Sequence, residues 1–469
     1  MSKPRRASND SSRSDAGIGW LIWDMLFAYQ EPSRVTIAKF IQRRRPEREF
    51  LTRLTFLLRP ESAKAAYSPI RSRQDEQASG LRHTRAPADV RDWLRDYVWC
   101  NMRTFFAAFV LVSLLQAQEI APFPKAYVQS VWVQSIWADG KHNGFPGIAR
   151  VGDFYYVTFR SGEGHGSEKS DIVVIRALAK DLKAWEKVAS FTREHDCRDP
   201  LVFDNKGRVQ VVFHSKEDFY SQSADGLTWS EPKELETEFV EPKADSRLTF
   251  TSQRRWLFRI RQGPDGAFYS LGRCGIHGKD SKGSFGLILF RSEDGVKFKG
   301  MHTYGEGPTS GISQAGGSGW GHEADVAWTP DGTLVSAIRN SNPGVVVFGK
   351  APLGPWKAFA TDAWNFGGPA LHTTKSGGML LAARALPEKQ TTGFPSVCKV
   401  WTVTANGVEK PWIMPSGGDG AYQSFADGPT GDEVLLAYYS SHEYPQPGGV
   451  GKNPTKIYLA HLRVKHIQP

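Results

Sequence analysis

The chain of 469 residues has 23% charged and 12% aromatic residues, a composition typical of globular proteins, and its length admits more than one domain. Its formal charge of +10 would suit a nucleic-acid partner only if the excess lay on the main domain. It lies at the front instead, since residues 1–101 hold 19 Lys and Arg against 12 Asp and Glu, leaving 40 against 37 for the remainder. We therefore expect no nucleic-acid partner.

The first 101 residues are rich in Arg and show no hydrophobic periodicity, which is typical of disordered sequence or of sequence that is not translated. Residues 102–117 follow the plan of a secretory signal peptide: Met102, a positive charge at Arg103, an eleven-residue apolar run interrupted only by Ser113, and a small-residue exit at Ala117. This apolar run is shorter than the roughly 20 residues that a membrane span needs.

We therefore expect translation to start at Met102, cleavage to follow Ala117, and the remaining monomer to be secreted or periplasmic without a membrane span. A basic cytoplasmic arm before a short anchor, or a core strand that imitates a signal, is the alternative interpretation. Three cysteines remain after Ala117, so at most one disulfide can form. Their spacing does not indicate a metal site, and no motif indicates an organic cofactor.

Residues 118–469 contain short β-rich runs separated by Gly, Asp and Pro, with no helix-period segment. One hairpin pattern, a Gly turn followed by two apolar strands, occurs six times. The six units are Phe154–Arg160 with Ile172–Leu178, Val209–His214 with Tyr220, Ala267–Arg273 with Leu287–Arg291, Thr333–Arg339 with Val345–Gly349, Met379–Arg384 with Lys399–Thr404, and Val434–Ser440 with Lys456–His461. The pattern predicts an all-β, six-bladed β-propeller, because each unit is one sheet that buries both faces only by stacking on its neighbours.

Two closing turns, Ser223–Trp229 and Ser292–Phe298, share the order Ser, any residue, Asp, Gly, and then an aromatic residue three positions later. Asp accepts hydrogen bonds from the amides of its own turn, Gly supplies a positive φ, and the aromatic ring wedges between sheets. These turns resemble the short Asp box of sialidases and other propellers, and we expect them to be structural.

A ring of polar side chains is expected where the first strand of each unit ends. Counting seven residues forward from successive turn glycines, or eight in the first unit, gives Arg160, His214, Arg273, Arg339, Arg384 and Tyr438. Arginine is rarely buried without a partner, so convergent guanidinium groups near the axis need anions from the protein or from a ligand. Salt bridges between blades are the alternative explanation.

Five further stretches resemble the exo-sialidase-like (BNR, or Asp-box) propellers of bacteria, and the resemblance covers residues 125–465. The stretches are Phe159–His165, Asp199-Pro200, Gly367–Pro369, Ser416–Asp419 and Tyr438–Glu443. Sialidases grip the carboxylate of sialic acid with three arginines and use a Tyr nucleophile, a Glu that activates it and an Asp acid/base. The resemblance implies Arg160, Arg339 and Arg384 as the clamp, Tyr422 as the nucleophile and Glu323 as its activator.

The chemistry fits these residue types. The anomeric carbon of such a substrate carries a carboxylate, which repels a charged nucleophile but not a neutral Tyr that gives its proton to Glu. Asp171, Asp196 and Asp199 compete for the acid/base role, with a slight preference for Asp199. The ring also makes Arg273, His214 and His165 candidates for substrate contacts.

Three functions stay open at this point. The first is a secreted retaining exo-glycosidase acting on terminal sialic acid or another acidic sugar of a glycan. The second is a propeller glycosidase on neutral sugars with paired carboxylates among Glu163, Glu323 and Asp199. The third is a non-catalytic glycan-binding propeller that uses His214, Trp320 and Trp364. The first strand ends in Thr158-Phe159-Arg160 rather than the Arg-Ile-Pro of sialidases proper, so the sugar itself is not defined.

Overall fold

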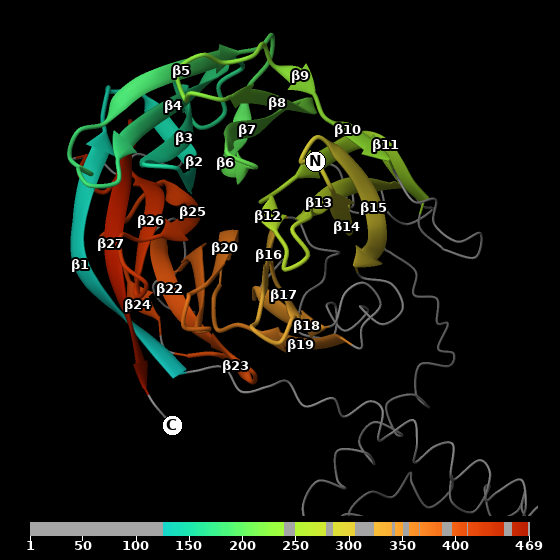
Figure 1. Cartoon of the computed structure of the whole chain (residues 1–469), viewed down its shortest axis with the longest axis vertical. Coiled ribbons are helices and arrows are strands. Elements are labelled where there is room, and N and C mark those ends of the chain that lie inside the picture. Colours follow the sequence, from blue (N-terminus) through green and yellow to red (C-terminus); the bar gives the residue numbers. More distant parts are fainter. Residues whose placement is uncertain are drawn as a thin grey trace, which may run out of the picture. The chain divides into compact units, whose positions relative to one another are not determined.

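A computed structural model describes ten segments of the chain: residues 125–238, 249–277, 285–304, 323–339, 343–349, 356–364, 366–386, 396–409, 411–444 and 453–467. Within these segments the protein consists of strands in six sheets arranged around a common centre, which confirms the predicted six-bladed β-propeller (Figure 1). The predicted extension at 1–101 and signal peptide at 102–117 lie outside the described residues. None of the described segments contains a helix long and apolar enough to cross a membrane.

The strands of each sheet pair antiparallel except β10 and β15 at the outer edge of the third sheet, and the blades follow one another in chain order (Figure 1). Blade 1 comprises β2 (His142–Val151), β3 (Phe154–Gly162), β4 (Ser170–Leu178) and β5 (Glu186–Thr192). Blade 2 comprises β6 (Arg198–Asn205), β7 (Arg208–Ser215), β8 (Glu217–Ser223) and β9 (Lys233–Glu234). Blade 3 comprises β10 (Glu236–Glu238), β11 (Thr249–Leu257), β12 (Arg261–Gln262), β13 (Phe268–His277), β14 (Phe285–Ser292) and β15 (Lys297–Tyr304).

The second half of the ring repeats the plan. Blade 4 comprises β16 (Ala324–Trp328), β17 (Leu334–Ile338), β18 (Val345–Gly349) and β19 (Trp356–Ala360). Blade 5 comprises β20 (Gly367–Thr373), β21 (Met379–Ala385), β22 (Val397–Thr404), β23 (Gly407–Val408) and β24 (Trp412–Ile413). Blade 6 combines β25 (Gly420–Asp427), β26 (Glu433–Ser440) and β27 (Lys456–Ile467) with β1 (Lys125–Trp137), so strands from both ends of the domain close the ring.

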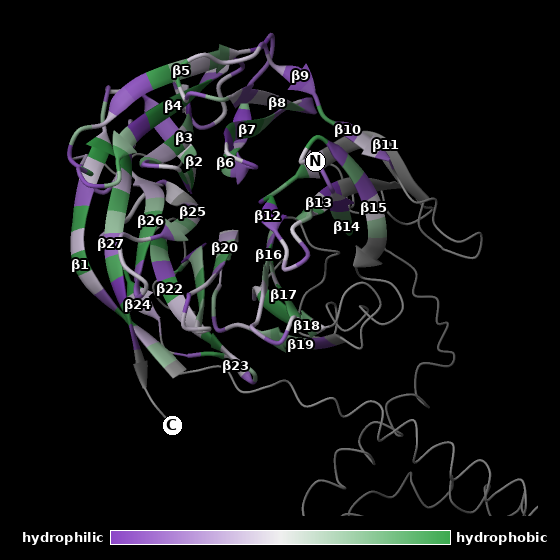
Figure 2. Ribbon diagram, viewed as in Figure 1, coloured by the Kyte–Doolittle hydropathy of each residue, from purple (hydrophilic) through white to green (hydrophobic). Residues whose placement is uncertain are grey.

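The hydrophobic core is divided among the spaces between blades. The buried apolar residues form six clusters, each drawing on two neighbouring blades, including one between blade 6 and blade 1. Side chains alternate along a strand, so Tyr155 and Val157 of β3 face blade 6 while Tyr156 faces blade 2. Figure 2 shows the corresponding apolar stretches on the inner strands. Both faces of each blade are thus buried, as the repeated hairpin predicts.

Turn chemistry follows the sequence in most blades. Gly152, Gly207, Gly266, Gly332 and Gly377 all have positive φ. In the turn at Ser223–Trp229, the carboxylate of Asp225 accepts hydrogen bonds from the amides of Leu227 (2.8 Å) and Thr228 (2.7 Å), and Asp294 does the same in the turn at Ser292–Phe298. These two turns therefore have the expected structural geometry.

Blade 6 departs from the predicted spacing by one residue. Ala421 pairs with Tyr439, at the register position where Gly367 pairs with Arg384 in blade 5. The predicted ring residue Tyr438 instead packs in the cluster between blades 5 and 6, and its hydroxyl donates to the carbonyl of Pro415 (2.8 Å). Tyr439 takes the ring position, because the turn before β26 is longer than the turns that set the count.

A β-bulge recurs near the start of the innermost strand in four blades. Its first residue has a left-handed backbone: Phe145 (φ 58°), Asp199 (φ 46°), Gly368 (φ 56°) and Tyr422 (φ 55°). This conformation is uncommon for residues other than Gly and strained for an aromatic residue, so the surrounding structure must hold it. The bulge redirects the side chain at this point of the strand.

Candidate active site

The functional side chains gather at one end of the propeller. In an antiparallel hairpin the start of the first strand lies beside the end of the second. Arg198 accordingly pairs with His214, Gly367 with Arg384, and the amide of Arg339 donates to the carbonyl of Glu323 (2.7 Å). The bulges and the predicted ring therefore meet at the same rim.

Tyr422 and Glu323 are in direct contact at this rim. The Tyr422 hydroxyl donates a hydrogen bond to Oε1 of Glu323 (2.5 Å). The same oxygen accepts a hydrogen bond from Nη1 of Arg339 (2.5 Å). The other carboxylate oxygen, Oε2, accepts the amide of Gly368 (2.7 Å). The Phe145 ring packs edge-on against the Tyr422 ring at 4.7 Å between centroids. Three blades thus fix the carboxylate of Glu323, which is only 4% exposed, against the phenol.

Charge around this pair separates the pKa values of its two members. Burial and the negative charges of Glu323 and Asp199 raise the pKa of Tyr422 well above its usual value. Burial alone would raise the pKa of Glu323 as well, but Arg339, the Tyr422 hydroxyl, Arg384 and the Gly368 amide outweigh it and lower that pKa. At neutral pH the phenol is therefore protonated and Glu323 is an anion that can accept its proton.

Asp199 is the second carboxyl group of the site. It is 8% exposed, and its Oδ1 has no hydrogen-bond partner among the described residues. Burial, followed by the negative charge of Glu323, raises its pKa to about 6 despite the opposing charges of Arg198 and Arg259. A carboxylic acid that titrates near neutral pH suits a general acid.

Arginines from several blades surround Tyr422. Arg339 and Arg384 both act electrostatically on the phenol, and Arg384 is 9% exposed with its Nε unpaired among the described residues. Arg273, whose guanidinium lies over the ring of Trp256 at 5.3 Å, has a pKa lowered by burial despite the nearby negative charges of Glu323 and Asp199. Guanidinium groups thus outnumber the carboxylates Glu323 and Asp199 in the described part of this rim.

Arg259 is a site residue that the sequence analysis missed. It is 6% exposed, and its guanidinium donates to the backbone carbonyls of Gln423 (2.5 Å) and Pro146 (3.5 Å), which belong to blades 6 and 1. Burial lowers its pKa to about 10, although the negative charges of Asp325 and Asp199 oppose this shift. The side chain therefore reaches from blade 3 across the centre of the ring.

Arg160, expected to form part of the clamp, is directed into the protein. Its side chain is fully buried, with Nε on Asp196 (2.8 Å) and Nη1 on the carbonyl of Gly164 (2.9 Å). Asp196 also receives Nε of Arg198 (2.5 Å). Arg160 is therefore paired within the protein, which is the alternative explanation given for the arginine ring. Asp196 is likewise engaged, because it pairs with both Arg160 and Arg198.

Three other predicted site residues, Asp171, His214 and His165, make contacts of their own outside the Tyr422–Glu323 pair. Asp171 lies on β4, where it accepts a hydrogen bond from Thr192 on the neighbouring strand (2.6 Å), and does not join the Tyr422 group. His214 stacks on Trp256 at 4.1 Å and contacts Asp218 (3.0 Å). His165 packs edge-on against Phe145 at 5.3 Å between ring centroids.

One spacing rule would have found the missed residues. Counting back seven to nine residues from each turn glycine, rather than forward, gives Phe145, Asp199, Arg259, Glu323, Gly368 and Tyr422. Four of them lie near the start of the innermost strand of their blade, Glu323 directly precedes β16, and Arg259 lies between β11 and β12. This spacing is hard to recognise in the sequence, because the residue type differs from blade to blade. The number of residues before the turn glycine also varies with the length of the turn.

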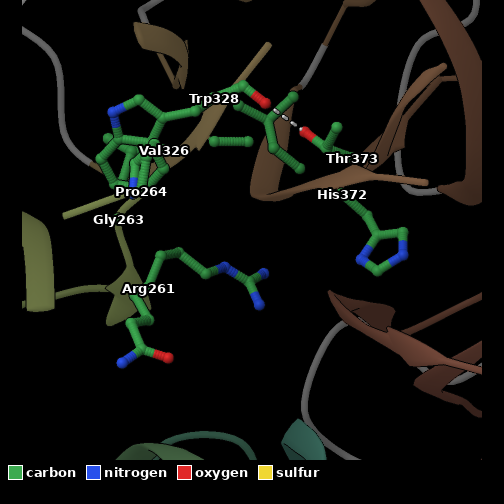
Figure 3. Close-up of a pocket in the computed structure, with 10 residues that line it drawn as sticks. Arg261, Gly263, Pro264, Val326, Trp328, His372 and Thr373 are labelled. Atoms are coloured by element: carbon green, nitrogen blue, oxygen red, sulfur yellow. Dashed lines mark hydrogen bonds between the residues drawn. The ribbon is translucent and has the colours of Figure 1, made fainter. Parts of the chain in front are cut away.

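A separate cavity of about 350 Å³ lies further along the innermost strands of blades 3 to 5 (Figure 3). Its wall includes Arg261, Trp328 and His372. Arg261 is held by the buried carboxylate of Asp325 through two hydrogen bonds (3.0 and 2.7 Å). None of the predicted catalytic residues lines this cavity.

Comparisons with known proteins agree with the fold. No protein-family model and no curated protein matches the chain. A protein of unknown function from Dyadobacter fermentans matches with a TM-score of 0.54 at 15% identity, over 72% of this chain and 99% of that one.

Structural neighbours also include sialidases and neuraminidases. A Trypanosoma rangeli sialidase in complex with the inhibitor DANA has a TM-score of 0.46 at 12% identity, over 72% of this chain and 60% of that one. The hemagglutinin-neuraminidase ectodomain of parainfluenza virus 5 has a TM-score of 0.45 at 7% identity, over 80% and 97%. The Dyadobacter likeness supports the propeller fold, and at such identities none of the three defines a reaction.

Proposed function

We propose that the protein is a retaining exo-glycosidase that removes a terminal acidic sugar, of the sialic acid type, from a glycan. The observation that carries the proposal is the 2.5 Å hydrogen bond from the Tyr422 hydroxyl to Glu323, at a rim rich in arginine. A phenol beside a carboxylate that is already ionised is arranged to lose its proton to that carboxylate as it attacks. The surrounding guanidinium groups stabilise the negative charge that develops on the phenol oxygen and attract an anionic sugar.

In the first step the Tyr422 oxygen forms a bond to the anomeric carbon while its proton passes to Glu323. The glycosidic bond breaks, and its electron pair goes to the leaving oxygen, which takes the proton of Asp199. In the second step Asp199 accepts a proton from water, whose oxygen attacks the same carbon. The bond to Tyr422 breaks, and Glu323 returns the proton to the phenol. Two displacements at one carbon give net retention.

The substrate carboxylate is proposed to bind among Arg259, Arg273, Arg339 and Arg384 rather than at Arg160. Arg160 is ion-paired with Asp196, which leaves only its Nη2 without a hydrogen-bond partner among the described residues, whereas Arg384 acts electrostatically on the Tyr422 phenol. A bidentate guanidinium contact with a carboxylate is shorter and stronger than a neutral hydrogen bond. Arg384 is therefore the first residue to test for recognition of the acid group.

The experiment is the release of 4-methylumbelliferone from its N-acetylneuraminic acid glycoside. Tyr422→Phe keeps the ring on Phe145 but removes the attacking oxygen, so we expect kcat/KM to fall about 10³-fold or more. Arg384→Ala should raise KM and lower kcat/KM. Tyr220→Phe, a half-buried tyrosine of β8, is the matched control and should keep full activity.

A 2,3-difluoro analogue of the acidic sugar should label the wild type at Tyr422, which peptide mass spectrometry would locate. Full activity in both Tyr422→Phe and Arg384→Ala would reject the proposed site. Hydrolysis of a neutral aryl glycoside that survives Tyr422→Phe but needs Asp199 and Glu323 would point to the paired-carboxylate mechanism instead.

A further inference from the structure

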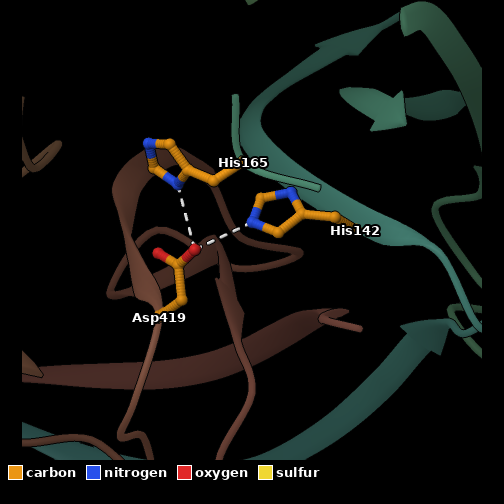
Figure 4. A group of neighbouring side chains, drawn as sticks. All are labelled: His142, His165 and Asp419. Atoms are coloured by element: carbon orange, nitrogen blue, oxygen red, sulfur yellow. Dashed lines mark hydrogen bonds and ion pairs between the residues drawn. The ribbon is translucent and has the colours of Figure 1, made fainter. Parts of the chain in front are cut away.

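A second group of titratable side chains lies beside the site but takes no part in the proposed reaction. His142 at the start of β2, His165 after β3 and Asp419 before β25 meet between blades 1 and 6 (Figure 4). One ligand atom from each lies within 4.8 Å of the others. His142 and Asp419 are buried, at 1% and 5% exposure, while the His165 side chain is 26% exposed. Solvent therefore reaches the group from the side of His165.

Both imidazoles point at one carboxylate oxygen. Oδ2 of Asp419 lies 2.8 Å from Nε2 of His142 and 2.9 Å from Nδ1 of His165, as Figure 4 shows. Two imidazole nitrogens and one carboxylate oxygen form a donor set suited to zinc and related divalent ions.

The surroundings hold these three groups in place. The Tyr439 hydroxyl donates to the other oxygen of Asp419 (3.1 Å), and the amide of Asp419 donates to the hydroxyl of Ser441 (2.9 Å). Arg198 donates to the carbonyl of His165 (2.9 Å). Such contacts around a donor set orient it and favour metal binding. The Asp419 carboxylate is therefore held by its neighbours, while the partly exposed His165 side chain has room to move.

We propose that His142, His165 and Asp419 form a binding site for a divalent transition ion of the zinc class. Bonds of about 2.0–2.1 Å in tetrahedral geometry place donor atoms about 3.3–3.4 Å apart, so the two contacts with Asp419 must each open by roughly 0.5 Å. The partly exposed His165 can make that movement, and water can fill the remaining position. The ion replaces the protons that the two nitrogens share with the carboxylate.

One feature limits the affinity. When Nε2 of His142 binds the ion, the ring proton moves to Nδ1, which has no hydrogen-bond partner among the described residues. The loss of such a supporting bond weakens metal sites by about 10–100-fold. We therefore expect a micromolar rather than a nanomolar dissociation constant.

The test is zinc titration of the chelator-treated, dialysed full chain by isothermal calorimetry, together with the visible absorption of the Co²⁺ form. We expect one saturable site of tetrahedral type in the wild type. His165→Ala should weaken it at least 100-fold, whereas His195→Ala, which removes a 40% exposed histidine, should leave it unchanged. Asp419→Asn should also lose the site, with circular dichroism reporting its folding.

Absence of a saturable site in the wild type, or equal affinity in wild type and His165→Ala, would overturn the proposal. The exposed His165 keeps the test decisive if Asp419→Asn does not fold. Because the readout is binding of zinc alone, the result is separate from sugar hydrolysis. A protein that binds zinc but releases no acidic sugar would refute only the proposed function.

Discussion

Asp199→Asn is expected to stabilise the protein while removing its proposed acid. The side chain is buried, and its pKa is raised from 3.8 to about 6. Because the folded state holds this proton more tightly than the unfolded chain, the free energy of unfolding falls as pH rises from about 4 to about 6. The penalty is complete above pH 6. At 1.36 kcal/mol per pKa unit it amounts to roughly 3 kcal/mol.

Asparagine is a suitable replacement, because it is one of the few residues that tolerate the left-handed backbone that Asp199 adopts at φ 46°. Denaturant unfolding of wild type and variant at pH 4.5 and pH 7.5 measures the effect. The variant should gain up to roughly 3 kcal/mol over wild type at pH 7.5 and clearly less at pH 4.5. Asp171→Asn, at the competing carboxyl group on β4, is the matched control and should show no such pH-dependent gain.

The same variant tests the chemistry. Loss of a general acid lowers the rate by about 10²–10⁴-fold, so Asp199→Asn should be stable but nearly inactive, and Asp171→Asn active. Wild-type activity should decline as pH rises through about 6, where Asp199 loses its proton. A variant that is less stable than wild type at pH 7.5, or whose stability gain is equal at both pH values, would refute the assignment of the raised pKa to burial.

Three further outcomes follow from the structure. Gly368→Ala would place Cβ 2.6 Å from Cα of Tyr422, so activity should fall about 10²-fold. Gly332→Ala, which also has a positive φ but would meet no atom within 4 Å, should change only stability. Arg259→Met should lower kcat/KM for an anionic glycoside at least tenfold more than for a neutral one, and an equal loss on both would contradict anion recognition. When the protein is expressed with its native leader, N-terminal sequencing should show that the mature protein begins after Ala117. A product that retains residues 1–101 would contradict the signal-peptide interpretation.

The fold could be predicted from the sequence because the repeated hairpin is encoded locally. Each blade has its own Gly turn and alternating apolar residues, and stacking of the blades then follows from the need to bury both faces. The count failed only in blade 6, where a longer turn moved the ring position from Tyr438 to Tyr439. Register depends on turn length, which composition does not reveal.

The site could be predicted only in part. Tyr422, Glu323 and Arg339 meet as expected, but Arg160 pairs with Asp196, a partner 36 residues away that no local pattern reveals. Arg259 was missed because it lies between β11 and β12, before the turn glycine from which the ring positions were counted forward. Which arginine faces the axis and which faces a neighbour depends on bulges, and these are set by contacts between blades.

The closure of blade 6 has a consequence for folding. Its outer strand β1 comes from residues 125–137 and pairs with β27 at residues 456–467. During synthesis the first five blades can stack in order, but β1 has no partner until the last strand is made, and until then both ends of the stack are open sheet surfaces. We expect ring closure to be the late, slow step, since contacts this distant in sequence carry the largest loop-closure entropy. Deleting either terminal strand should therefore leave the whole domain prone to aggregation.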